Sequence, residues 1–194
     1  MVKKALLISV MLLAVLAPAM SAPAAYNVLL AGGAASNTIH IWLTPDGRDY
    51  VIDSIVPLEV GGNVCSNPEG NPNELICPAV KIAGFEVNAD GGDDRISVSN
   101  QVTIPVTMRG GSGDDILAGG RGADKLIGGS GDDLLMGGGG ADVLVGSAGN
   151  DVQVAGPGDD LILTGPGKDV VKPGAGADRV RQRAGKPSAA GERP

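Results

Sequence analysis

The sequence predicts an all-β fold, a right-handed parallel solenoid with an irregular β-rich cap at its N-terminal end. Residues 110–181 divide without a gap into eight nonapeptides, which indicates a repeat architecture. Residues 26–109 contain short β-compatible runs separated by Gly, Pro, Asn and Asp clusters. The chain has only one Trp, two Tyr and one Phe. A conventional globular core would therefore be thin, whereas a solenoid buries stacked aliphatic side chains instead.

Each nonapeptide combines a turn with a very short strand. The fourth place is always Gly and the sixth is always Asp, while the second is Gly in all repeats except at Ser147. Glycine adopts positive φ angles and permits close backbone approach, so this half forms a tight turn. The three residues after the Asp form the strand, and its middle residue, in the eighth place, is aliphatic except at Gln153. Two repeats make one coil of 18 residues, with the eighth-place side chains inside.

The sixth-place aspartates line up along the two turn edges of such a solenoid. They are Asp115, Asp124, Asp133, Asp142, Asp151, Asp160, Asp169 and Asp178. Equivalent residues of stacked coils lie roughly 4.8 Å apart, so each row of carboxylates repels itself unless a cation lies within it. Carboxylate and turn carbonyl oxygens suit Ca²⁺ better than Mg²⁺ or zinc, and the array contains no His or Cys. The sequence therefore predicts several calcium sites.

These repeats, such as Gly110–Ala118 and Gly128–Met136, resemble the haemolysin-type (RTX) calcium-binding nonapeptide, GGxGxDxUx. The resemblance covers 72 of the 194 residues. It implies a parallel β-roll in which Ca²⁺ lies between successive turns, held by the sixth-place Asp and by turn carbonyls. By this resemblance the eight aspartates above bind metal, together with the first-place glycines Gly110, Gly119, Gly128 and Gly137. We do not infer toxin activity from the resemblance. Toxins of that type leave the cell by means of a C-terminal signal and lack an N-terminal one, whereas this chain has the opposite arrangement.

The array becomes less regular towards its C-terminal end. The first place loses Gly at Ala155, Thr164 and Pro173, and Lys168 places a positive charge beside Asp169. We expect the strongest sites between Gly110 and Asp151, and weaker ones after them. Gln153 is a polar residue at an inward position and requires a hydrogen-bond partner there.

The N-terminal 25 residues have the features of a secretory signal peptide. Lys3 and Lys4 form a basic start, residues 5–16 are apolar, and residues 17–25 are rich in Ala, Pro and Ser. The apolar run is short for a membrane anchor of about 20 residues. We expect a secreted, extracellular bacterial protein whose mature chain contains no integral membrane span.

Residues 26–109 form a different segment, which we expect to cap the array. Gly92–Ile96 reproduces the fourth to eighth places of the repeat and indicates one degenerate coil. A separate small β-sandwich is the alternative. Cys65 and Cys77 are the only cysteines of the chain, and the loop Ser66–Asn73 between them has no apolar residue. In an exported chain they predict a disulfide. Residues 182–194 are predicted to be a disordered tail.

The charge balance and the motifs narrow the function. Without residues 1–25 the chain has 13 basic and 22 acidic residues, a net charge of −9, which argues against nucleic acid and favours cations. The single histidine, His40, excludes an HExxH zinc motif, and no nucleophile elbow or phosphate-binding loop occurs. We predict no catalytic residues and expect a structural, adhesive or interaction module that calcium folds. The alternative is a secreted hydrolase with an unrecognised active site in its N-terminal domain.

The outward strand positions suggest a surface for a partner. Ten of them carry aliphatic side chains or methionine: Ile116, Ile127, Leu134, Met136, Val143, Val145, Val152, Val154, Leu161 and Leu163. Scattered surface aliphatics are common on β proteins. The alternative is that one face packs against a second copy of the chain or against another surface.

Overall fold

The structure is a computed structural model of the chain, and it describes residues 26–54, 59–61, 65–66, 71, 73–79 and 82–182. The predicted signal peptide (1–25) and residues 183–194 of the predicted tail lie outside this range. No helix long and apolar enough to cross a membrane occurs among the described residues.

The described residues form sixteen β-strands. They are β1 (Tyr26–Gly33), β2 (Thr38–Leu43), β3 (Asp49–Ser54), β4 (Glu59–Gly61), β5 (Glu74–Pro78), β6 (Ile82–Asp90), β7 (Arg95–Val98), β8 (Val106–Ser112), β9 (Ile116–Ala118), β10 (Lys125–Ser130), β11 (Leu134–Met136), β12 (Val143–Ala148), β13 (Val152–Pro157), β14 (Leu161–Leu163), β15 (Val170–Ala175) and β16 (Arg179–Arg181). In the array the strands of three residues are too short to persist alone, so pairing with neighbouring coils must hold them.

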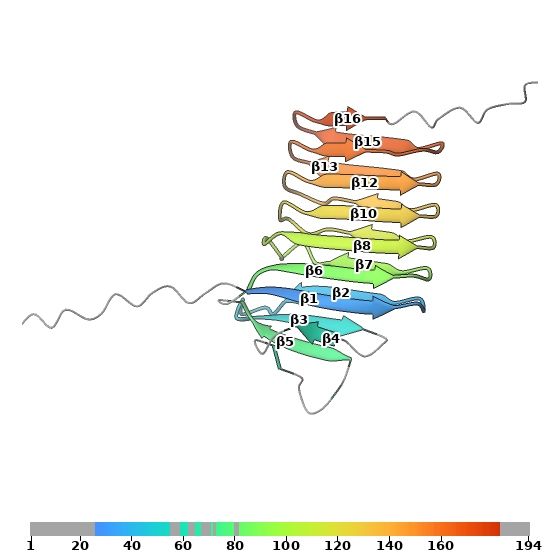
Figure 1. Ribbon diagram of the computed structural model, residues 1–194. Coiled ribbons are helices and arrows are strands. Elements are labelled where there is room, and N and C mark those ends of the chain that lie inside the picture. Colours follow the sequence, from blue (N-terminus) through green and yellow to red (C-terminus); the bar gives the residue numbers. More distant parts are fainter. Residues whose placement is uncertain are drawn as a thin grey trace, which may run out of the picture.

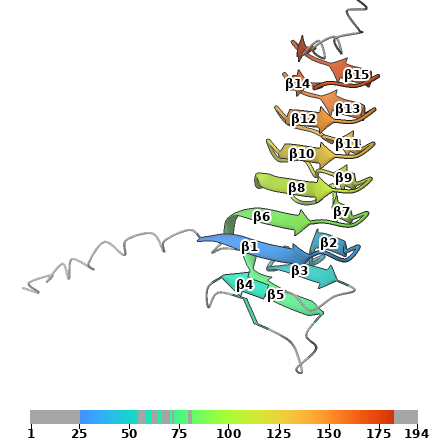
Figure 2. The same cartoon turned by 45° about the vertical axis from the view of Figure 1, so that its right-hand side comes forward.

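The strands build two eight-stranded sheets that form the two faces of a solenoid (Figures 1 and 2). One sheet has the order β16-β14-β12-β10-β8-β6-β1-β4, and the other has the order β15-β13-β11-β9-β7-β2-β3-β5. Sheet A and sheet B denote these two sheets below. The chain alternates between them along the array, so each coil contributes one strand to each face. The predicted all-β parallel solenoid is confirmed.

The register of the sheets repeats every 18 residues in the array. Leu126 pairs with Leu144 in sheet A, and Leu135 pairs with Gln153 in sheet B. Because every side chain therefore lies above its equivalent in the next coil, the nonapeptide pattern becomes columns of inner aliphatics, of turn aspartates and of outward residues.

The N-terminal segment continues the same two sheets. Strand β1 pairs in parallel with β6, and β2 pairs in parallel with β7. Strands β3 and β5 add to sheet B, and β4 adds to sheet A, all with antiparallel pairing. The segment thus contributes two irregular coils, β1–β2 and β6–β7, with β3, β4 and β5 covering the first. The second of these coils is the one that Gly92–Ile96 indicated individually, within the irregular solenoid with wider coils that we expected as the cap.

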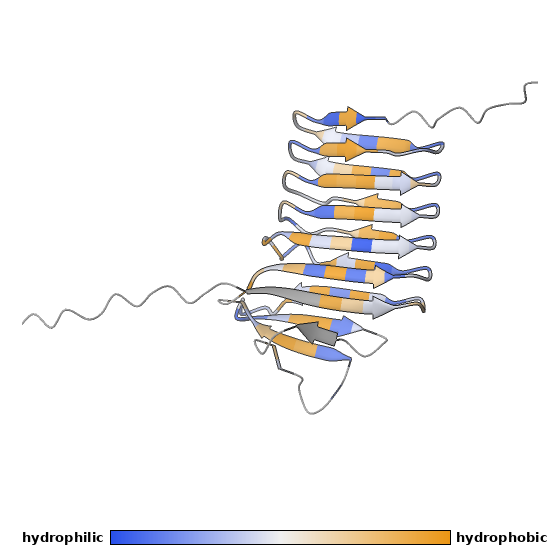
Figure 3. Ribbon diagram, viewed as in Figure 1, coloured by the Kyte–Doolittle hydropathy of each residue, from blue (hydrophilic) through white to orange (hydrophobic). Residues whose placement is uncertain are grey.

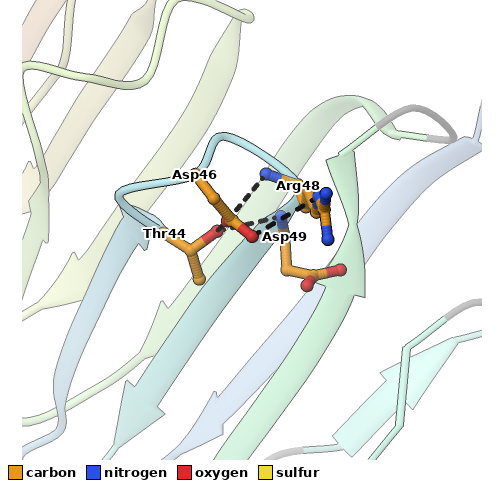
Figure 4. Close-up of polar contacts among 4 residues, drawn as sticks. All are labelled: Thr44, Asp46, Arg48 and Asp49. Carbon is orange, nitrogen blue, oxygen red and sulfur yellow. Dashed lines mark hydrogen bonds and ion pairs between the residues drawn. The ribbon is translucent and has the colours of Figure 1, made fainter.

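The hairpin between β2 and β3 is fixed by local polar contacts (Figure 4). The Asp46 carboxylate accepts hydrogen bonds from the Thr44 hydroxyl (2.7 Å) and the Arg48 amide (3.2 Å), and its other oxygen lies 3.5 Å from Arg48 Nε. Gly47 supplies the positive φ of 69° that this turn needs. Beside the hairpin strands, the predicted disulfide between Cys65 and Cys77 is present.

The core is a column of aliphatic side chains between the two sheets. Leu117, Leu126, Leu135, Leu144 and Ile162 are fully buried eighth-place residues. Gln153 is buried among them. Its Nε2 donates to the Leu163 carbonyl at 3.2 Å, whereas its side-chain oxygen Oε1 has no hydrogen-bond partner. In the part of the chain that the structure describes, the column ends with the eighth-place Val180, which is 46% exposed.

The outward residues of the strands are only partly exposed. All ten aliphatic and methionine positions identified in the sequence are half-buried, because their neighbours in the coils above and below shield them. Figure 3 shows apolar bands along the strands of the array, where these residues and the inner column alternate.

Candidate metal centre

The turns between the strands stack in two columns, one on each edge of the solenoid. We call the turns that lead from sheet A to sheet B the first stack, and those that lead back to sheet A the second stack. Asp115, Asp133, Asp151 and Asp169 lie in the first stack. Asp124, Asp142, Asp160 and Asp178 lie in the second. The structure therefore divides the eight predicted aspartates into two rows of four.

Each aspartate is bonded to the coil that precedes it. Its Oδ1 accepts a hydrogen bond from a backbone amide of the preceding coil, in most cases that of the equivalent aspartate. The donor lies 18 positions earlier in the sequence, or 21 positions earlier for Asp115. The distances are 2.9 Å from Asp115 to Asp133, 2.8 Å from Asp124 to Asp142 and 2.8 Å from Asp142 to Asp160. These bonds form two continuous ladders, and they use one oxygen of every carboxylate.

The second carboxylate oxygen has no hydrogen-bond donor in most turns. Oδ2 is buried and unpartnered in Asp94, Asp115, Asp133, Asp142, Asp151, Asp160 and Asp169. Asp124 differs, because its Oδ2 accepts the Gly120 amide at 2.8 Å. A buried carboxylate oxygen without a partner is strongly destabilising unless a proton or a cation compensates for it.

The first-place glycines make room for these oxygens. A Cβ at Gly128 would overlap Asp133 Oδ2, and Gly110 and Gly146 stand in the same relation to Asp115 and Asp151. At Gly119 a Cβ would also lie only 2.6 Å from Asp124 Oδ2. At these positions glycine leaves free the space that the carboxylate occupies.

A carbonyl of the next coil approaches the same point. The position that a Cβ of Gly137 would occupy lies 2.6 Å from the Ala155 carbonyl, and for Gly146 it lies 2.5 Å from the Thr164 carbonyl. The carboxylate oxygens of Asp142 and Asp151 converge on these positions as well. Each of these positions is thus flanked by a carboxylate oxygen and by a carbonyl oxygen of the next coil, which is an arrangement that a cation would stabilise.

Burial in this environment changes the acidity of the aspartates. Loss of solvation raises the pKa of Asp133 and Asp142 to about 7, although a backbone amide bonded to each carboxylate lowers it, and neighbouring carboxylates raise it further. The pKa of Asp115 and that of Asp124 rise to about 6, mainly through burial. Burial also raises the pKa of Asp94, Asp151 and Asp160.

The donor atoms of the two stacks fit calcium. Among the described residues, no three His, Cys, Asp or Glu side chains lie close enough together to hold a metal ion. Each candidate site must therefore combine carboxylates with backbone carbonyls, which is an all-oxygen set in a flexible frame of the kind that Ca²⁺ accepts. The residues present fit the ion through the unpartnered Oδ2 atoms and the converging carbonyls.

The candidate sites become less enclosed towards the C-terminal end. The aspartates from Asp115 to Asp160 are buried, whereas Asp169 and Asp178 are half-buried. The first places of the last three repeats are Ala155, Thr164 and Pro173, which bring side chains to positions where glycine leaves space for the carboxylate.

The eight aspartates predicted to bind metal leave out two members of the first ladder. Asp94 lies in the degenerate coil and is buried, and its amide donates to Asp115 Oδ1 at 2.8 Å. Asn37 extends the ladder by one more turn, because its amide donates to Asp94 Oδ1 at 2.6 Å. The signal was present in Gly32-Gly33-Ala34-Ala35-Ser36-Asn37, with Asn in the sixth place, but 57 residues separate it from Asp94.

The two stacks differ in their exposed fifth places. In the first stack these residues form a second ladder, in which Asp93 accepts the Asp114 amide and Asp114 accepts the Asp132 amide. The second stack has Ala123, Ala141 and Ala177 in this place, and only Asp159 is acidic there. The outer edge of the first stack therefore carries more negative charge.

Comparison with known protein families matches residues 109–144 and 145–180 to the RTX calcium-binding nonapeptide repeat, each match spanning four copies. No curated protein sequence matches the chain. No solved structure matches it either. The matched ranges coincide with the regular coils, whose turns hold the eight aspartates. Residues 109–180 of this chain therefore form a β-solenoid of the RTX calcium-binding nonapeptide repeat family.

Proposed function

We propose that the array binds several Ca²⁺ ions between successive turns, that this binding drives its folding, and that the chain is a secreted structural, adhesive or interaction module. The observation that carries the proposal is the set of buried, unpartnered Oδ2 atoms in both turn stacks. At neutral pH the metal-free array must either retain protons on these groups or expose them to water. Binding free energy then becomes folding free energy.

Calcium titration of the secreted chain tests the proposal. Circular dichroism should show a calcium-dependent gain of β signal, and calorimetry should show several ions bound per chain, with Mg²⁺ a poor substitute. A chain that is fully ordered in excess chelator and binds no Ca²⁺ at millimolar concentration would contradict the proposal.

Export from the cell is supported by the disulfide. Cys65 and Cys77 are bonded to each other, and such bonds form in oxidising compartments. The predicted signal peptide (1–25) lies outside the described residues. N-terminal sequencing of protein recovered from the culture medium checks both points, and a first residue before residue 17 would contradict cleavage of a signal peptide.

A partner surface remains a proposal that rests on the outward aliphatic residues. In sheet B these include Leu134, Met136, Val152 and Val154, which lie on adjacent strands β11 and β13. Sedimentation at high protein concentration in calcium tests self-association. A strictly monomeric protein in these conditions would leave a surface of another kind as the partner.

The alternative, a secreted hydrolase, is favoured by one observation. His40 Nδ1 lies 2.7 Å from the Ser97 hydroxyl, and Asp53 is the cross-strand neighbour of His40, so Ser, His and Asp follow one another across β7, β2 and β3. His40 and Asp53 are exposed on a sheet face, whereas nucleophilic sites are usually enclosed. Ester hydrolysis that Ser97→Ala abolishes would establish this activity. Equal rates for both proteins would reject Ser97 as a nucleophile.

A further inference from the structure

The turn before β2, which leads from sheet A to sheet B, is the first turn of the first stack. Gly33 pairs with Asp90 between β1 and β6, and Thr38 pairs with Arg95 between β2 and β7. These pairings place residues 32–37 directly below the turn that ends in Asp94. The backbone amide of Asn37 donates to Asp94 Oδ1, as the backbone amides of the aspartates in the array donate to the aspartate of the next coil. Asn37 is therefore the structural equivalent of a sixth-place aspartate.

The side chain of Asn37 is surrounded by oxygens. Its Nδ2 lies 2.7 Å from the Ala35 carbonyl, 3.0 Å from Asp94 Oδ1, 3.2 Å from the Ala89 carbonyl and 3.4 Å from the Gly33 carbonyl. The residue is 2% exposed. A carboxamide nitrogen has two hydrogens to donate, so this buried group supplies positive partial charge to four acceptors from two successive turns.

The same place in the array holds an oxygen instead. A Cβ at Gly32 would lie 2.7 Å from Asn37 Nδ2 and 2.8 Å from the Ala89 carbonyl. At Gly146 the two corresponding atoms are Asp151 Oδ2 and the Thr164 carbonyl. Beside this glycine the array has a carboxylate oxygen and a carbonyl oxygen. In the first turn, Asn37 Nδ2 replaces the carboxylate oxygen and donates to the Ala89 carbonyl.

We infer that the turn of residues 32–37 is a calcium-independent end of the ladder, in which the side-chain NH2 group of Asn37 takes the place that a cation takes in the array. The turn is complete without an ion, and it keeps Asp94 in register for the coils that follow. The contrast with the array rests on the proposed function, whereas the order of this turn without metal does not depend on it.

An exchange of residues between the two kinds of turn tests the inference in the full-length secreted chain. Asn37→Asp creates an array-like turn. In chelator, we expect backbone amides of residues 37–43 to exchange hydrogen about tenfold faster or more than in the unmodified chain. The reason is that the carboxylate oxygen in place of Nδ2 is buried and has no hydrogen-bond donor. Excess Ca²⁺ should restore their protection, and calorimetry should count one additional ion.

Asp133→Asn makes the reciprocal change and keeps the Oδ1 acceptor. This variant should bind one ion fewer, and amides of residues 134–136 should exchange more slowly in chelator than in the unmodified chain. Asp114→Asn is the matched control. It removes the same charge from an exposed fifth-place residue, and it should change neither the ion count nor the exchange of those amides.

The outcomes separate the inference from the proposed function. Rapid exchange of residues 37–43 in the unmodified chain in chelator would overturn the inference, as would an Asn37→Asp variant with unchanged protection there. If the unmodified chain binds no calcium but Asn37→Asp still loses protection in chelator, the proposed function fails, and the role of the Asn37 amide stands.

Discussion

The sixth-place aspartate has two separate tasks at the two oxygens of its carboxylate. Oδ1 accepts a backbone amide from the preceding coil and holds the coils together. Oδ2 faces the first-place glycine and has no donor in most turns. Replacement of the residue therefore removes a structural hydrogen bond and a candidate ligand together.

Substitution of Asp133 should have a larger effect than substitution of Asp178. Asp133 is buried and bonded on both sides, because it accepts the Asp115 amide and donates its own amide to Asp151. Asp178 is half-buried in the last turn. We expect Asp133→Ala to raise the calcium concentration needed for ordering by about tenfold or more, and Asp178→Ala to raise it less. Circular dichroism titration measures both, and equal shifts would contradict a graded series of sites.

Gly128→Ala tests the space reserved for the carboxylate. The added methyl group would overlap Asp133 Oδ2, so the carboxylate must move and the variant should lose about 1–3 kcal/mol of stability in calcium. Gly139→Ala is the control, because its Cβ would meet nothing closer than 3.9 Å. Thermal unfolding in calcium compares the two variants, and similar losses would show that the first place has no special role.

At the scale of the element, each turn stack contains a run of buried aspartates whose pKa is raised. Four carboxylates, those of Asp115, Asp124, Asp133 and Asp142, have a pKa raised to about 6 or 7. The metal-free solenoid therefore binds more protons than the unfolded chain does between about pH 4 and pH 7. Protons and cations are alternative ways of compensating the same oxygens.

The pH dependence of stability should consequently reverse when calcium is added. In calcium-free buffer the folded-state pKa values are raised, so their contribution to stability is present at about pH 4 and is lost as the pH rises through 6 and 7. With excess Ca²⁺, protons compete with the ion, and stability should instead increase over this range. Melting temperatures at pH 4.5, 6 and 8 in both buffers measure this, and parallel trends would contradict it.

At the scale of the whole molecule, the described residues form a stack that further strands cover at its N-terminal end, whereas no described coil follows β15 and β16. Strands β3, β4 and β5 cover the N-terminal end, where the disulfide and the Asn37 turn also lie. At the other end the inner column finishes with the partly exposed Val180. We expect the array to order from its N-terminal side, because that side is the only described part that presents a completed coil to the next one.

Loss of the disulfide should weaken the N-terminal end and leave the array intact. Cys65 and Cys77 are 12 positions apart, and a loop of this length contributes about 3 kcal/mol in the loop-entropy description. Cys65→Ser with Cys77→Ser should lower the melting temperature in calcium without changing the number of ions bound. A changed ion count would indicate that the cap also shapes the array sites.

The sequence by itself determined the period of the solenoid, the inner column and the positions of the turn aspartates. These features depend on residues that are close together in the chain, and 18-residue coils repeat them often enough to be recognised. The disulfide was predictable for a different reason, because the chain has only two cysteines and they can pair in only one way. Gln153 was predicted to need a partner, which the Leu163 carbonyl provides.

Tertiary structure decided which oxygen of each carboxylate lacks a donor and how far the first ladder extends. Five strands, β2 to β6, separate Asn37 from Asp94 along the chain, and the parallel pairing of β1 with β6 and of β2 with β7 brings the two residues together. The burial of each aspartate also depends on the coil above it, so Asp133 and Asp178 occupy the same place in the repeat and differ in exposure. Repeat position is a local property of the sequence, whereas solvation and hydrogen-bond partners arise only when the coils stack.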